Sequence, residues 1–87
     1  MNIIKKISII LTSLLIGMGA AQAETWNMAL AYGAGNFHSQ NAEEFAKAVT
    51  EKSDGKLTIK THPGGSLFKG GAILRAVQTG QTQIGER

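Results

Sequence analysis

The 87-residue sequence contains no cysteine. The chain can therefore form no disulfide, and it cannot carry a lipid anchor attached through a cysteine. Histidine is scarce as well, and His38 and His62 lack the i, i+4 spacing that brings two imidazoles to one metal ion on a helix. We therefore expect neither a metal centre nor a cofactor.

The sequence also lacks clusters of one charge. Nine Lys and Arg residues against six Asp and Glu residues give a formal charge of +3, but Lys5 and Lys6 belong to a separate N-terminal segment. Residues 24–87 keep seven basic and six acidic residues, scattered along the chain, for a net charge of +1. This pattern disfavours nucleic acid and anionic membranes as partners, and it disfavours a short secreted peptide acting as a toxin.

No hydrophobic run is long enough for a typical transmembrane helix. Residues 7–21 are mostly apolar, but that stretch is shorter than the roughly 20 residues that cross a bilayer. Lys5 and Lys6 precede it, and the small residues of "AQA" follow it, which is the pattern of a secretory signal. We predict a signal peptide over residues 1–23, cleavage after Ala23, secretion through a membrane and no membrane insertion after cleavage.

The remaining 64 residues, 24–87, are few for an independent domain. A chain of about 60 residues buries only about 60% of the surface that its unfolded form exposes, and no disulfide compensates here. We therefore interpret residues 24–87 as the N-terminal part of a longer protein.

Two strand patterns and one helix pattern occupy the first half of this region. Residues 25–32, "TWNMALAY", are apolar on both faces, which favours the interior of a sheet. A helix is predicted next, with an apolar stripe of Ala42, Phe45, Ala46 and Val49. Residues 57–61, "LTIKT", alternate as in an edge strand.

The boundaries of the first helix are set by polar residues and glycine. We expect Ser39 or Asn41 to cap its N-terminus, since Asn41 and Glu44 have capping-box spacing. Gly55 is expected at the left-handed position after its C-terminus.

A second helix and a third strand complete the pattern. The helix is predicted over residues 71–79, with Ile73, Ala76 and Val77 on one stripe and Gly80 after its end. Ile84 begins the third strand. The order strand, helix, strand, helix, strand predicts an α/β fold (β-α-β-α-β) with a mainly parallel sheet.

Motifs for nucleotide binding or catalysis are incomplete. "GAGNFH" has His38 where a dinucleotide fingerprint has its third glycine, and the loop "HPGGSLFKGG" lacks the Gly-Lys-Ser/Thr of a phosphate loop. Neither Ser39 nor Ser66 lies in a G-x-S-x-G elbow or beside an evident base. No catalytic residue is predicted. An alternative remains a secreted α/β enzyme whose catalytic residues lie downstream.

Residues 25–87 resemble the start of the solute-binding proteins of TRAP transporters, the DctP family. The resemblance rests on "AEEFAKAVTEKSDGKL", on a strand ending in His-Pro, and on "ILRAVQTGQ". It implies a periplasmic receptor rather than an enzyme, with two α/β lobes that close on an organic acid. It also implies delivery of that acid to membrane permease subunits, driven by an ion gradient. Residues 24–87 then correspond to the first part of lobe 1.

The resemblance further implies which loops line the ligand cleft. These are the loop after the first strand, the loop into the second helix, and the end of the third strand. The candidate ligand-binding residues are Tyr32, Phe37, His38, Gly70, Gly71, Glu86 and Arg87. The family's carboxylate-pairing arginine is expected beyond residue 87.

The chain departs from the family pattern in the glycine-rich loop, where "FKGG" replaces the usual polar residues after Leu67. Backbone amides at Gly70 and Gly71 could take over contacts with an anionic solute. Alternatively, the glycines of this loop serve turn geometry alone, an interpretation that we favour for Gly64 and Gly65.

Overall fold

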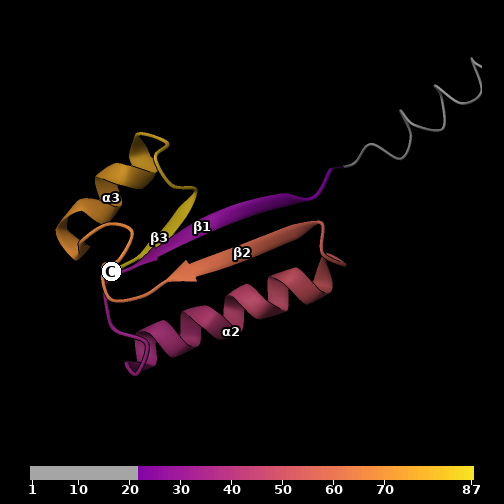
Figure 1. The fold of residues 1–87 in the computed structure, drawn as a ribbon, viewed down its shortest axis with the longest axis horizontal. Coiled ribbons are helices and arrows are strands. Elements are labelled where there is room, and N and C mark those ends of the chain that lie inside the picture. The colour runs from indigo at the N-terminus through magenta and orange to yellow at the C-terminus, as the bar shows by residue number, and fades with distance from the viewer. Residues whose placement is uncertain (1–21) are drawn as a thin grey trace, which may run out of the picture.

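The computed structural model of the protein describes residues 22–87, and Figure 1 shows their arrangement. The predicted signal peptide, residues 1–23, lies outside the described residues except for its last two, which form no regular structure. Within the described part, no helix combines the length and apolar character needed to cross a membrane.

Three parallel strands form one sheet in the order β2-β1-β3. Strand β1 spans Glu24–Leu30, β2 spans Leu57–His62 and β3 spans Ile84–Glu86. The predicted parallel α/β fold is confirmed, with the doubly apolar first strand in the centre and the alternating second strand outside it. The first strand is shorter at its C-terminal end than predicted, because Ala31 and Tyr32 already belong to the loop.

Helix α2 spans Phe37–Lys52 and begins earlier than predicted. Its N-cap is Asn36, whose side chain accepts a hydrogen bond from the backbone N–H of His38. The expectation that Ser39 or Asn41 caps this helix is wrong, because both residues already lie inside it. At the other end, Asp54 with φ 53° takes the left-handed position expected for Gly55, which follows it with φ 75°.

Helix α3 spans Gly70–Gln78, one residue earlier than predicted at each end. Gly80 occupies the predicted left-handed position with φ 76°. Its N–H donates to the carbonyl of Val77 at 3.2 Å, and the N–H of Gln81 donates to the carbonyl of Ala76 at 2.8 Å. This pair of hydrogen bonds is a Schellman motif. It ends the helix just before Gly80, as the sequence predicted.

The two helices cover opposite faces of the sheet (Figure 1). Met28 and Leu30 of β1 pack with Ala42 and Ala46 of α2 in the main core cluster. The intervening Ala29, fully buried, faces α3, because a side-chain carbon on its neighbour Gly85 would meet Ile73. Alternate residues of β1 therefore pack into two cores, one on each face of the sheet, as expected for a central strand.

The glycine-rich loop after β2 folds back onto the end of β1. The N–H of Gly64 donates to the carbonyl of Tyr32 at 2.8 Å, and the N–H of Gly65 donates to the carbonyl of Leu30 at 2.9 Å. Both glycines have φ near +70°, at 69° and 67°. Turn geometry, the interpretation favoured from the sequence, thus accounts for this pair.

Candidate functional site

The carboxyl ends of the three strands meet at one end of the sheet, on the left in Figure 1. The loops that enter α2 and α3 leave from this end, and the two helices then run back along opposite faces. In open α/β sheets, ligands bind at the carboxyl ends of strands whose connections diverge in this way. The ends of β1 and β3 therefore mark the candidate site.

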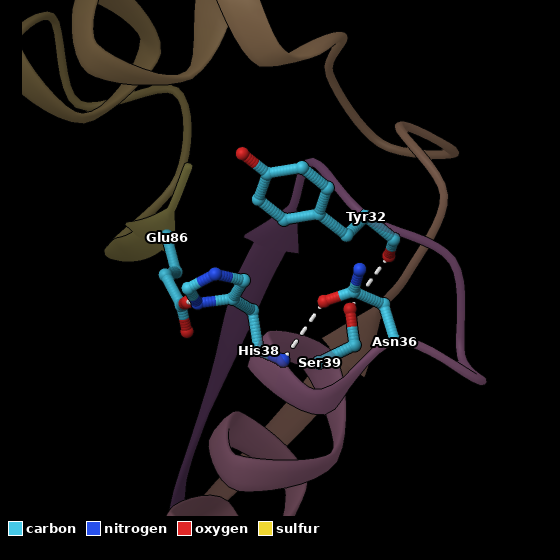
Figure 2. Close-up of polar contacts among 5 residues, drawn as sticks. All are labelled: Tyr32, Asn36, His38, Ser39 and Glu86. Atoms are coloured by element: carbon cyan, nitrogen blue, oxygen red, sulfur yellow. Dashed lines mark hydrogen bonds and ion pairs between the residues drawn. The ribbon is translucent and has the colours of Figure 1, made fainter.

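Three short contacts shape the loop between β1 and α2, and Figure 2 shows those of the Asn36 and Ser39 side chains. The N–H of Asn36 donates to the carbonyl of Gly33 at 2.9 Å, which closes a turn. The side-chain oxygen Oδ1 of Asn36 then accepts the His38 N–H at 2.9 Å, and buried Ser39 donates from Oγ to the carbonyl of Tyr32 at 2.6 Å. The first turn of α2 is thereby tied to the end of β1.

This loop gathers three aromatic rings and one carboxylate. The His38 imidazole stacks on the Tyr32 ring, with centroids 5.1 Å apart, and lies 4.0 Å from the Phe37 ring. Its Nδ1 lies 3.2 Å from Oε1 of Glu86, the last residue of β3 (Figure 2). Glu86 reaches this place because β3 pairs with β1 in register, with Glu86 opposite Leu30.

A hollow of about 460 Å³ opens at the same end of the sheet. It is lined by Ala31, Tyr32, Gly70 and Arg87, so it draws on the ends of β1 and β3 and on the start of α3. A side-chain carbon on Gly70 would stand 3.3 Å from the Ala31 side chain, which is tight. Glycine at this position keeps α3 close to β1 and leaves the hollow open.

The structure gathers most of the predicted site residues at this end. Tyr32, Phe37, His38 and Glu86 form one contact cluster, and Tyr32, Gly70 and Arg87 share the hollow. Gly71 lies one residue further into α3, with open space where a side chain would stand. Ligand contact by these seven residues stays a prediction.

Two positioning residues were missed or misassigned from the sequence. Asn36 follows "GAG" directly, and Asn is one of the preferred N-cap residues. The prediction instead relied on the capping-box spacing of Asn41 and Glu44. Ser39 was expected to cap the helix, yet it is only 2% exposed and bonds the Tyr32 carbonyl. Its hydroxyl thus holds the loop in place.

The other histidine, His62, contacts a side chain of the neighbouring strand. Nε2 of His62, the last residue of β2, lies 2.9 Å from Oδ1 of Asn27 on the neighbouring strand β1. Within residues 22–87, no group of three or more His, Cys, Asp or Glu side chains is placed to hold a metal ion.

Comparison with known proteins identifies the family. A profile described as bacterial extracellular solute-binding protein, family 7 (DctP), matches residues 28–86. A marine metagenome TRAP solute-binding protein specific for pyroglutamate is 61% identical, with a TM-score of 0.73, over 76% of this chain and 22% of that one.

Two receptors of Bordetella pertussis that bind pyroglutamic acid, DctP6 and DctP7, are also similar. DctP6 is 45% identical, with a TM-score of 0.70, over 71% of this chain and 21% of the receptor. DctP7 is 36% identical, with a TM-score of 0.71, over 72% of this chain and 21% of the receptor. The chain thus spans about a fifth of the length of these solved relatives. On its sequence match and its fold, it belongs to the DctP family of bacterial extracellular solute-binding proteins.

Proposed function

We propose that this chain is the N-terminal part of the first lobe of a TRAP-type solute receptor that captures pyroglutamate or a closely related small organic acid. The observation that carries the proposal is the 61% identity to a receptor specific for pyroglutamate. Identity at this level extends over 76% of the chain.

The geometry at the strand ends supports a binding role. The hollow between β1, β3 and α3 is open and brings together a guanidinium from Arg87, a phenol from Tyr32 and the start of a helix at Gly70. These groups suit a small anion with an apolar ring, since the guanidinium pairs with a carboxylate and the aromatic ring packs on carbon. We assign this surface to one wall of a cleft that a second lobe closes.

A binding role requires no covalent chemistry. Bound solute favours the closed arrangement of two lobes because it contacts both of them. The competing hypothesis, a secreted α/β enzyme with its catalytic residues downstream, has less support, because the chain is 61% identical to a solute receptor. Within residues 22–87, Ser39 donates to a backbone carbonyl and His38 faces Glu86. These are positioning contacts and form no nucleophile–base pair.

The cellular setting follows from the same proposal. The signal peptide predicted over residues 1–23 directs the receptor to the periplasm, where it releases solute to membrane permease subunits. The candidate ligand contacts come from Tyr32, Phe37, His38, Gly70, Gly71, Glu86 and Arg87.

A receptor chimera tests the proposal. We define it as the marine pyroglutamate-binding protein with its matching segment replaced by residues 24–87. Isothermal titration calorimetry with pyroglutamate is expected to give binding comparable with that of the parent. Arg87→Gln is expected to weaken binding by at least about tenfold, because a hydrogen bond to a charged group is lost.

Lys60→Gln is the matched control, since Lys60 is exposed on β2 and outside the site. It is expected to leave affinity unchanged. A folded chimera that gives no heat with pyroglutamate, while the parent does, would contradict the proposed function.

A further inference from the structure

Glu86 places a carboxylate at a site that we assign to an acid. Its side chain is about one-third exposed, at 36%, and lies at the carboxyl end of β3. Glu86 borders a hollow beside α2, whereas the next residue, Arg87, borders the hollow at the start of α3. A carboxylate here repels an anionic solute unless the solute presents a hydrogen-bond donor to it. The presence of Glu86 therefore carries information about which acids fit.

The backbone and the side chain of Glu86 are both held. Its carbonyl accepts the N–H of Ala31 at 3.1 Å, which fixes the end of β3 against β1. Its Oε1 lies 3.2 Å from Nδ1 of His38. An ionised carboxylate accepts hydrogen bonds at both oxygens, so this contact leaves the acceptor capacity of Oε2 for another donor.

His38 is in turn fixed from several directions. Its ring lies against the rings of Tyr32 and Phe37, and its backbone N–H bonds the Asn36 side chain (Figure 2). It occupies the first turn of α2, where the helix dipole favours a neighbouring negative charge such as that of Glu86. Both the imidazolium and the neutral ring with its proton on Nδ1 donate toward Oε1.

We propose that His38 is a positioning residue that orients Glu86 to accept a hydrogen bond from a ring N–H of the solute, and that this pair makes the receptor specific for lactam acids. This inference rests on the proposed function and names the chemical group of the solute that the site recognises, the ring N–H. Pyroglutamate is such a solute, because its ring carries an amide N–H as well as a carboxylate. The carboxylate pairs with cations, and the N–H meets Oε2 of Glu86.

The expected selectivity follows from the interaction of Glu86 with an acid whose ring lacks the N–H group. If an oxygen replaces the ring N–H, a lone pair faces the Glu86 carboxylate, and neither group finds a donor. Sites built to bind a substrate N–H or O–H reject analogues without it by large factors, about 10⁴–10⁵. Because Glu86 is partly exposed, we expect a smaller preference, of about 100-fold.

The test compares two ligands on the receptor chimera: pyroglutamate and its lactone, in which oxygen replaces the ring N–H. Titration calorimetry is expected to show about 100-fold tighter binding of the lactam. Glu86→Gln is expected to reduce this ratio to about tenfold or less, since its amide can donate to the lactone oxygen. Glu51→Gln, an exposed carboxylate near the far end of α2, is the control and keeps the ratio.

The role of His38 is tested by the same ratio. His38→Ala is expected to lower it by about tenfold, because Glu86 loses its orienting donor. His38→Asn, whose amide nitrogen replaces Nδ1, is expected to restore most of it. His62→Ala controls for general destabilisation, since loss of its Asn27 contact lowers the melting temperature without changing the ratio.

The outcomes separate the two proposals. Equal affinities for lactam and lactone, or a ratio unchanged in both Glu86→Gln and His38→Ala, would overturn the specificity inference while the proposed function stands. Failure of the folded chimera to bind either ring acid would instead remove the proposed function itself.

Discussion

Gly85 lies in the middle of β3, where its Cα faces helix α3. A side-chain carbon at this position would stand 2.5 Å from Cγ2 of Ile73 and 3.5 Å from Cγ2 of Val77. Ile73 is buried and held between the helix and the sheet, so it has little freedom to move aside. The close approach of α3 to β3 therefore depends on glycine at this one position.

We predict that Gly85→Ala destabilises the receptor chimera by about 1–3 kcal/mol, the usual cost of overpacking a core. Gly71→Ala is the matched control, because nothing lies within 4 Å of its added carbon. Alanine in the first turn of α3 is expected to leave stability unchanged or to raise it slightly. Scanning calorimetry measures both, and a Gly85→Ala variant that melts no lower than Gly71→Ala would refute this account of the packing.

At the same scale, the sequence placed residues at the site but did not predict their contacts. The family resemblance assigned Tyr32, His38 and Glu86 to the ligand cleft, and the parallel strands bring them to one end of the sheet. The His38–Glu86 contact could not be predicted, because it depends on β3 pairing with Glu86 opposite Leu30. A shift of one residue in that register would turn Glu86 to the other face.

Among the elements, helix α2 shows how local signals compete. Asn36, Ser39 and Asn41 all have side chains suited to an N-cap, and the spacing of Asn41 and Glu44 favoured the last. The structure uses Asn36, because a helix that begins at Phe37 also lets Ser39 bond the Tyr32 carbonyl. Element type and order were predictable from periodicity, whereas this boundary was decided by a tertiary contact.

The start of α2 gives a prediction that separates the two interpretations. Asn36→Ala in the receptor chimera is expected to lower the free energy of unfolding by about 1 kcal/mol, the typical value of an N-cap. Asn41→Ala is expected to change it by less than about 0.5 kcal/mol, since Asn41 is exposed inside the helix. Urea denaturation followed by circular dichroism measures both. A larger loss for Asn41→Ala would restore the capping box predicted from the sequence.

At the scale of the whole molecule, the described residues leave much apolar surface uncovered. Phe45 of α2 is 50% exposed and Leu74 of α3 is 54% exposed. Apolar hollows on both faces of the sheet border Ile84 and Gly85 of β3, one reaching Phe45 and the other Leu74. Surfaces of this kind are covered in stable domains, so we expect further structure to pack here in the complete receptor.

We predict that residues 24–87 alone do not fold cooperatively. A chain of 64 residues without disulfides has a marginal core, and here the side chains on both helices that should add to it are half exposed. Thermal circular dichroism at 222 nm is expected to show a broad, non-sigmoidal loss of helix, while the receptor chimera gives a single sharp transition. Residues 24–87 are present in both samples, which differ only in the rest of the receptor that packs against them in the chimera. A sigmoidal transition from a monomeric 24–87 peptide would show that the two small cores on either side of β1 suffice, and it would remove the need for that covering structure.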